Sequence, residues 1–272
     1  MSDRIQGKVA RAFELSGRVA VVTGAGRGIG RSAASLLADA GASVVVADID
    51  EANAKQTASE ISAATGSSVV ARKVDTSQRV EVDALVASAV AEFGRLDIMV
   101  NNAGIITDTP ILDISEEEID RVHGVNFTGV LFGCQAAARA MIPQGSGSII
   151  NVASGAIDVP SPTVGAYGSS KAAVAQLSRT FATEIGSTGV RVNVVAPGWI
   201  DTPMNERHVT VDGSIDPQKR EQQLKQRGSM SVLGKTGEPD DIGFAILYLA
   251  SDAAKFYTGN VMRPNGGATM PW

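Results

Sequence analysis

Short apolar runs alternate along the chain with longer stretches of mixed character. The apolar runs lack a two-residue alternation of apolar and polar positions, which is typical of strands buried on both faces of a sheet. Strands are predicted over residues 18–23, 43–47, 69–74, 97–100, 147–152, 190–195 and 260–263. Helices are predicted over residues 28–40, 52–64, 78–93, 115–142, 165–186 and 239–250. This order predicts an α/β fold with a parallel sheet covered by helices on both faces.

The chain is predicted to form one domain, because 272 residues suit a single α/β domain and no linker or low-complexity tract interrupts the pattern. Residues 1–16 are interpreted as an N-terminal extension, and residues 17–272 as the domain. The segment 199–236 is long for a connection and includes a helical pattern at 217–227. Long loops in compact domains are often lids, so we expect this segment to cover a substrate.

The unusual residues follow the predicted strands. They are the glycine-rich stretch Gly24–Gly30, Asp48, Asp75, Asn101–Gly104, Ser154 and Pro197–Gly198. The carboxyl ends of parallel strands meet at one edge of a sheet, which is where open α/β sheets bind ligands. The sequence therefore predicts a binding site at this edge.

Composition excludes several other kinds of function. The net charge is −5 and no basic stretch occurs, so nucleic acid is not expected as a partner. One cysteine and two distant histidines offer neither a disulfide nor a metal site. No run of 18 apolar residues predicts a membrane span, and the first 14 residues lack the apolar core of a signal peptide. We therefore expect a cytoplasmic protein without metal.

The first predicted strand runs into a turn that contains Gly24, Gly28 and Gly30. Such a turn brings backbone N–H groups and a helix N-terminus against a pyrophosphate. The spacing is not a strict G-x-G-x-x-G, and a tight strand–helix junction is the alternative interpretation. Asp48 favours the dinucleotide, because a carboxylate at the end of the second strand can accept hydrogen bonds from the adenosine ribose.

Asp48 also bears on the choice of dinucleotide. Its carboxylate would repel a 2′-phosphate, so NAD is expected and NADP is the weaker candidate. Arg27 argues the other way, since a guanidinium in this turn could pair with that phosphate. Asp75 either contacts the adenine or caps the helix predicted from residue 78.

Tyr167 and Lys171 lie four residues apart in a predicted helix, so they share one helix face. A phenol transfers protons near neutral pH only if its pKa falls by roughly 3 units from about 10, which takes about 4 kcal/mol. An exposed pair at this spacing contributes only about 0.2–0.5 kcal/mol. Such a pair is usually a solvated helix face, and catalysis would need a desolvated cleft and a second positive charge.

The glycine turn, Asn101-Asn-Ala-Gly104, Ser154 and Tyr167-x-x-x-Lys171 together resemble the classical short-chain dehydrogenase/reductase (SDR) family. The resemblance runs from about Ser16 to Ala268. It implies a Rossmann-like, doubly wound sheet of about seven strands, and a homotetramer. The chain departs from the family pattern in Ala153, where a second serine is frequent, and in Arg263-Pro-Asn-Gly-Gly267, where an aspartate usually precedes the glycines.

The resemblance also implies roles for individual residues. Ser154 would hold the substrate oxygen, Tyr167 would transfer the proton, and Lys171 would bind the nicotinamide ribose and lower the tyrosine's pKa. Asn126 would support a water relay to the lysine, and the oxidised nicotinamide would supply the second positive charge. The residues assigned to cofactor binding are Gly24, Arg27, Gly28, Ile29, Gly30, Asp48, Asp75, Thr76, Asn102, Ala103, Gly104, Tyr167, Lys171, Pro197, Gly198, Ile200 and Thr202.

These residues favour reversible hydride transfer between NAD(H) and a secondary alcohol or ketone, with a small molecule as substrate. A 3-oxoacyl-carrier-protein reductase that uses NADPH is the first alternative, and it would require a basic docking patch near the cleft. A non-catalytic dinucleotide sensor is the second, but a sensor has no need of Asn126, Ser154, Tyr167 and Lys171. Two interpretations stay open for Ile105, Ile157, Trp199 and Met204: they form apolar walls of the substrate pocket, or they pack the segment 199–236 against the body of the domain.

Overall fold

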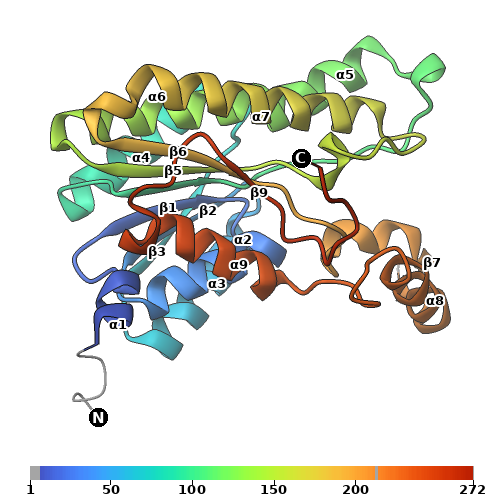
Figure 1. Ribbon diagram of the computed structural model, residues 1–272, viewed down its shortest axis with the longest axis horizontal. Helices are drawn as coiled ribbons and strands as arrows, with labels where there is room; N and C mark the ends of the chain where they lie inside the picture. Colours follow the sequence, from blue (N-terminus) through green and yellow to red (C-terminus); the bar gives the residue numbers. More distant parts are fainter. Residues whose placement is uncertain (1–6, 212–213, 272) are drawn as a thin grey trace.

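The computed structural model describes residues 7–211 and 214–271. Its centre is a parallel sheet of seven strands in the order β3-β2-β1-β4-β5-β6-β9 (Figure 1). The strands are β1 Val19–Thr23, β2 Ser43–Asp48, β3 Val69–Lys73, β4 Ile98–Asn101, β5 Gly147–Val152, β6 Val190–Val195 and β9 Val261–Met262. The predicted fold class is confirmed. The strand order reverses between β1 and β4, and in sheets of this kind the crevice at that point binds ligands.

Helices cover both faces of the sheet (Figure 1). One face carries α2 Gly28–Asp39, α3 Glu51–Thr65 and α9 Pro239–Ala250. The other carries α4 Arg79–Phe93, α5 Glu116–His123, α6 Gly129–Met141 and α7 Gly165–Ile185. Apart from the stretch 115–142, the observed bounds lie close to the predicted ones, because turn residues separate each helix from its strand in the sequence.

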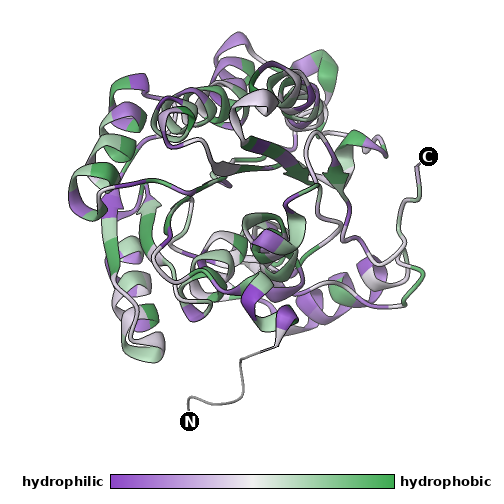
Figure 2. Ribbon diagram, turned by 60° about the vertical axis from the view of Figure 1, so that its left-hand side comes forward, coloured by the Kyte–Doolittle hydropathy of each residue, from purple (hydrophilic) through white to green (hydrophobic). Residues whose placement is uncertain are grey.

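Two apolar cores lie on opposite faces of the sheet. In β1, Ala20 and Val22 pack into one core and Val21 into the other, and all three are fully buried. Figure 2 shows the apolar strands inside a shell of helices whose polar positions lie outward. Burial on both faces explains why the strands show no alternation of apolar and polar residues.

The helix predicted over 115–142 is wrong as one continuous α-helix. A π-helical turn, Gly124–Thr128, separates α5 from α6, and residues Ile142–Gln144 form a 3₁₀ turn. A π turn inserts an extra residue into the helix and so rotates the following side chains, and it is found often at functional sites. Here the turn contains Asn126, whose side chain is fully buried.

The predicted lid segment folds into a 3₁₀ helix at Pro203–His208, a hairpin of β7 Thr210–Val211 and β8 Ser214–Ile215, and α8 Pro217–Gly228. The helical pattern at 217–227 is therefore α8. An ion pair of 2.7 Å between Arg220 and Asp201 joins α8 to the beginning of the segment. Residues 212 and 213 lie outside the described residues, and closure of the segment as a lid remains a prediction.

Packing onto the core begins before residue 17. Helix α1 spans Lys8–Phe13, and Leu15 is fully buried in the core beneath α2 and donates its backbone N–H to the carbonyl of Ala40 at 2.7 Å. Residues 1–6 of the predicted extension, and Trp272, lie outside the described residues. Within the part of the chain that is described, no helix is long and apolar enough to cross a membrane.

Candidate active site

The glycine turn after β1 leaves no room for side chains at two of its positions. Gly24 has a positive φ of 60°, and a Cβ atom there would lie 2.8 Å from the Cα of Ala103. A Cβ atom on Gly30 would lie 2.2 Å from the carbonyl oxygen of Gly24. Asn102 fastens the turn, because its Nδ2 donates to the carbonyls of Thr23 and Gly24, both at 3.0 Å. The spacing of the glycines in the sequence therefore reflects a turn that is too tightly packed for side chains at Gly24 and Gly30.

Helix α2 begins at this turn with its N-terminus towards a cavity of about 450 Å³. Its N-cap residue is Arg27, and no side chain caps the helix. The first N–H groups of a helix lack partners within the helix, and an anion is a favourable ligand for them. Gly28 and Ile29 line the cavity. This uncapped N-terminus beside a cavity fits the pyrophosphate of a dinucleotide.

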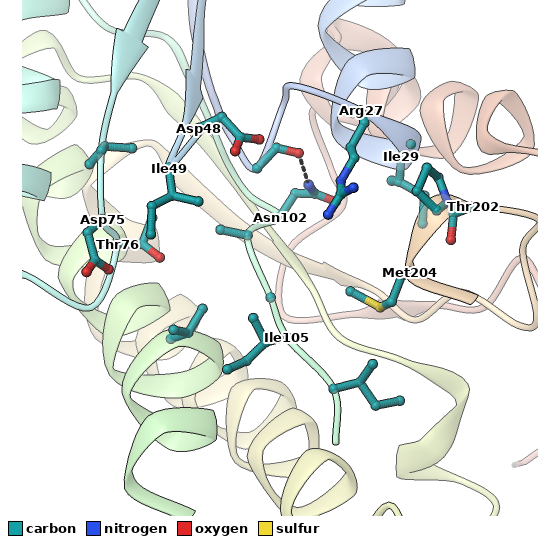
Figure 3. Close-up of a pocket in the computed structure, with 18 residues that line it drawn as sticks. Arg27, Ile29, Asp48, Ile49, Asp75, Thr76, Asn102, Ile105, Thr202 and Met204 are labelled. Carbon is teal, nitrogen blue, oxygen red and sulfur yellow. Dashed lines mark hydrogen bonds between the residues drawn. The ribbon is translucent and has the colours of Figure 1, made fainter. Parts of the chain in front are cut away.

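Asp48 lies at the end of β2, on the wall of the same cavity (Figure 3). Its two carboxylate oxygens accept hydrogen bonds from the backbone N–H groups of Gly26 at 2.9 Å and Asp50 at 3.0 Å. Each oxygen keeps a second lone pair for a ligand hydroxyl. Arg27 is exposed and lines the cavity as well. Asp48, which favours NAD, and Arg27, which favours NADP, therefore belong to one site.

Asp75 and Thr76 line this cavity too, beyond Ile49 in Figure 3. Asp75 accepts hydrogen bonds from the backbone N–H and the hydroxyl of Ser77, at 2.9 and 2.7 Å. The N-cap of α4 is Gln78, so Asp75 is not the capping residue of that helix. Its carboxylate shapes the loop that follows β3.

A second cavity of about 340 Å³ contains Ser154, Tyr167 and Lys171 on its wall. The two cavities share Ile29, Asn102, Gly104, Ile106, Thr202 and Met204, and together form one cleft along the carboxyl edge of the sheet. Pro197, Gly198 and Ile200 line the second cavity. Of the residues assigned to catalysis and cofactor binding, all line the cleft except Gly30 and Asn126, which are buried behind it.

Lys171 is almost completely buried, with 3% of its surface exposed. Its Nζ donates to the carbonyl of Val152 at 2.9 Å and lies 5.8 Å from the centre of the Tyr167 ring. Burial lowers the pKa of Lys171 from 10.5 to about 8, because the charged form loses its hydration. The lysine of the Tyr167–Lys171 pair is therefore desolvated.

The buried amine should make the stability of the protein depend on pH. Between about pH 8 and pH 10.5 the unfolded chain holds the proton on Lys171 and the folded chain does not, so the free energy of unfolding rises with pH. The rise from this group is about 3 kcal/mol. Denaturant titrations of the wild type and Lys171→Met across pH 7–10.5 should show the wild type gaining this amount relative to the variant.

Lys225→Met serves as the control, because Lys225 is exposed and paired with Glu221 at 2.7 Å. It should show no such gain over the same pH range. If the difference between wild type and Lys171→Met stays constant with pH, then Lys171 titrates as an ordinary lysine.

Ser154 follows β5 and begins a short 3₁₀ turn, Gly155–Ile157. Its Oγ accepts a hydrogen bond from the backbone N–H of Ala156 at 3.2 Å. This contact occupies a lone pair and leaves the hydroxyl proton for another acceptor. A hydroxyl held in this way, on a cavity wall shared with Tyr167, can donate to a substrate oxygen.

Asn126 holds the loop after β4. Its Oδ1 accepts from the N–H of Ile105 at 2.8 Å, and its Nδ2 donates to the carbonyl of Ile105 at 2.9 Å and to the Oγ of Ser170 at 3.0 Å. A Cβ atom on Gly104 would lie 3.3 Å from both the Asn126 Oδ1 and the Lys171 Nζ. Asn126 is thus a positioning residue next to the lysine, and its part in a water relay remains a prediction.

Asn101 belongs to the core, unlike its neighbour Asn102. Its Nδ2 donates to the Oδ1 of Asn151 at 2.8 Å, and the Nδ2 of Asn151 donates to the Oγ of Ser178 at 2.9 Å. Cys134 lies in the same buried group, and burial raises the pKa of its thiol to about 12. These side chains join β4, β5, α6 and α7. Among the residues that the structure describes, no three His, Cys, Asp or Glu side chains are placed to hold a metal ion.

The Arg263 that precedes the final glycines forms an ion pair with Asp158, with its Nε donating to Oδ2 at 2.7 Å and its Nη2 to Oδ1 at 3.2 Å. Asp158 lies just after the turn that begins at Ser154. Arg263 therefore joins the end of the sheet to the loop beside the site through a bidentate ion pair.

Several residues of the second cavity had no signal in the sequence. They are Asp108, Ala156, Ser161, Pro162, Thr163, Val164, Asn205 and Arg227. Thr163 is the one non-glycine residue in the described chain with a positive φ, 67°, a strained conformation found often at functional sites. Trp199 and Met204 line the cavity as expected, Ile105 lines the first cavity, and Ile157 packs against the core.

Known proteins resemble the chain over nearly its whole length. A family model described as enoyl-(acyl carrier protein) reductase matches residues 24–269. A short-chain dehydrogenase/reductase of Aspergillus oryzae is 38% identical over 260 residues, covering 95% of this chain and 97% of that protein. A 3-oxoacyl-[acyl-carrier-protein] reductase of Chlamydia muridarum is 38% identical over 254 residues, covering 93% and 98%.

A solved structure, 7α-hydroxysteroid dehydrogenase in complex with NADH and 7-oxo glycochenodeoxycholic acid, superposes with a TM-score of 0.86 at 34% identity and covers 95% of this chain and 96% of that one. Residues 24–269, which the family model matches, include the glycine turn, the strand-end residues and the Tyr167–Lys171 pair, and so both halves of the cleft. The chain belongs to the short-chain dehydrogenase/reductase family of oxidoreductases.

Proposed function

We propose that the protein interconverts a secondary alcohol and a ketone by hydride transfer with NAD(H), and that Tyr167 acts as the general acid and base. The observation that carries this proposal is the single cleft. One end has an uncapped helix N-terminus and Asp48, and the other has Ser154, Tyr167 and the buried Lys171. A dinucleotide that binds along this cleft brings its reactive ring towards the second cavity.

Each group of side chains in the cleft has a separate role in this proposal. The Gly28 end of α2 would hold the pyrophosphate and Asp48 the adenosine ribose. When bound, the nicotinamide supplies or accepts the hydride. In the direction of reduction, Tyr167 protonates the substrate oxygen, and Ser154 donates a hydrogen bond to the charge that develops there. Lys171 is charged below a pH of about 8 and favours the phenolate that remains.

Asp48 should make the enzyme prefer NADH, because a 2′-phosphate beside its carboxylate is repelled. Replacing Asp48 by asparagine removes the charge and keeps the shape, so we expect the ratio of kcat/KM for NADH over NADPH to fall by roughly 10-fold or more. Steady-state kinetics with both dinucleotides measure this ratio.

Arg27→Gln is the companion variant, since Arg27 lines the same cavity and carries the opposite charge. It should weaken whatever use of NADPH the wild type shows and leave NADH kinetics close to normal. A wild type with a clearly higher kcat/KM for NADPH would contradict the preference for NAD, though not the proposed chemistry.

A 3-oxoacyl-carrier-protein reductase is the second candidate, and the 38% identity to a relative of that name favours it. A non-catalytic sensor is the third, and the full set of Ser154, Tyr167 and Lys171 on one cavity disfavours it. Oxidation of NADH or NADPH with a broad panel of ketones and a 3-oxoacyl thioester distinguishes the three. Turnover of small ketones supports the proposal, turnover of the thioester alone supports the second candidate, and binding of dinucleotide without any turnover supports the sensor.

We also propose a homotetramer, which rests on the family resemblance. The helices after β4 and β5 are rich in alanine, which fits either a contact between subunits or the internal core. Ala136, Ala137 and Ala182 are buried inside the subunit, with 6%, 0% and 6% exposed, and belong to its core.

A further inference from the structure

One cationic side chain of the substrate cavity takes no part in the proposed chemistry. Arg227 belongs to the last turn of α8 and lines the same cavity as Ser154 and Tyr167. It is partly buried, whereas most of the charged residues on α8 are exposed. It does not line the first cavity. The chain thus places a guanidinium in the substrate half of the cleft.

Arg227 forms no ion pair with a carboxylate anywhere in residues 7–211 and 214–271. Its Nη1 lies 4.0 Å from the Sδ of Met230, and a contact of this length is too weak to satisfy a cation. Other cations of α8 do have partners. Arg220 pairs with Asp201 at 2.7 Å, and Lys225 pairs with Glu221 at 2.7 Å.

A partly buried guanidinium without a carboxylate has lost hydration and gained little in return. The helix dipole favours a basic side chain in the last turn of a helix, which is another possible reason for an arginine here. Exposed Lys225 lies in the same turn, outside the cavity, and already interacts with the dipole, so the dipole does not require Arg227 to lie in the cavity. The planar fork of arginine matches a carboxylate in a bidentate pair. The missing partner of Arg227 is therefore a ligand of the cavity.

We propose that Arg227 binds a carboxylate of the substrate, so that the enzyme acts on an oxo acid and the corresponding hydroxy acid. This inference rests on the proposed function, since it takes Tyr167 as the site of the reacting oxygen. The carboxylate lies at α8, and Trp199 and Met204 supply apolar walls in the same cavity for the carbon chain.

The other charged groups of the cavity are compatible with this assignment. Lys171 is buried, and its Nζ already donates to Val152 at the reacting end. Asp108 is exposed and has an interaction of its own, so water screens its repulsion of an anion. Among the described residues that line this cavity, Arg227 is the cation left for a carboxylate.

The test uses methyl ketones in which the number of carbon atoms between the ketone and the carboxylate increases. A series is needed because the cavity determines which spacing lets the ketone reach Tyr167 while the carboxylate reaches Arg227. The probes are 3-oxobutanoate, 4-oxopentanoate, 5-oxohexanoate and 6-oxoheptanoate, each beside its primary amide, with simple ketones such as butanone and cyclohexanone. The amide keeps the shape and removes the charge. We expect the wild type to have a kcat/KM at least roughly 10-fold higher for the acid than for the amide at one chain length.

Arg227→Gln should remove this preference by raising the KM for the acid roughly 10- to 100-fold, with kcat and the amide little changed. Arg227→Lys keeps the charge but not the bidentate fork, so its preference for the acid over the amide should lie between those of the wild type and Arg227→Gln. The matched control is Lys225→Gln, which removes a cation from the same turn of α8 outside the cavity and should leave the preference for the acid intact.

Three results would overturn the inference and leave the proposed function standing. The first is a wild type with the same kcat/KM for the acids and their amides. The second is a wild type that reduces simple ketones and none of the keto acids. The third is an Arg227→Gln variant that loses the same fraction of its activity on the acid and on the amide. The last would show that Arg227 only supports the fold of α8. If no ketone of any kind is reduced with either dinucleotide, the proposed function fails and this inference fails with it.

Discussion

Replacing Tyr167 by phenylalanine is expected to lower kcat for ketone reduction by roughly 10²- to 10⁴-fold, because the substrate oxygen loses its proton donor. The side chain keeps its ring, so its packing on the cavity wall should persist. Affinity for NADH should change little, since the pyrophosphate and adenosine contacts lie in the other half of the cleft. Steady-state kinetics and the quenching of protein fluorescence by NADH measure the two effects separately.

Tyr257→Phe makes the same chemical change away from the cleft, where the Tyr257 ring packs edge-on against Tyr248 with the ring centres 6.0 Å apart. It should keep nearly full activity. A Tyr167→Phe variant that retains more than about a tenth of the wild-type kcat would be incompatible with Tyr167 as general acid. A variant that fails to bind NADH would instead show that the Tyr167 hydroxyl is essential for cofactor binding.

Replacing Ser154 by alanine is expected to lower kcat by roughly 10²- to 10³-fold, the usual cost of one donor to a developing oxyanion. The reason lies in the local geometry. The Ala156 N–H occupies one lone pair of the Ser154 Oγ, which leaves the hydroxyl to donate into the cavity. The loss should appear in kcat and kcat/KM alike, because the interaction strengthens as charge develops on the substrate oxygen.

Ser154 also caps a short 3₁₀ turn, so its removal costs stability as well as activity. Ser251 provides the matched control, because its Oγ accepts from the Ala253 N–H at 3.3 Å and begins a similar turn outside the cleft. Ser251→Ala should unfold at a lower temperature and remain active. If both variants lose activity only in proportion to their loss of folded protein, Ser154 has no role in catalysis.

Much of the site could be predicted because its residues come directly after strands. A buried parallel strand is a short apolar run, and the residue that follows it lies at the ligand edge whatever the strand order. Gly24, Asp48 and Ser154 were identified in this way, and the structure places all three on the cleft. Tyr167 and Lys171 were identified because a spacing of four residues defines a shared helix face.

Other features had no local signal. The π turn at Gly124–Thr128 contains Asn126, which contacts Ile105 and Ser170, 21 and 44 residues away in the sequence. Asn101 and Asn102 are identical neighbours, yet one belongs to the core and the other to the glycine turn. Leu15 looked like part of an extension, and its burial depends on α2.

The sequence by itself determined the alternation of strands and helices, the ligand edge of the sheet and the residues at that edge, because each depends on short-range spacing. The tertiary structure alone decided the strand order, the burial that brings the pKa of Lys171 to about 8, and the position of Arg227 on the substrate cavity. These properties depend on desolvation and on contacts between distant segments. Neither leaves a pattern among neighbouring residues, since both arise only when the chain has packed.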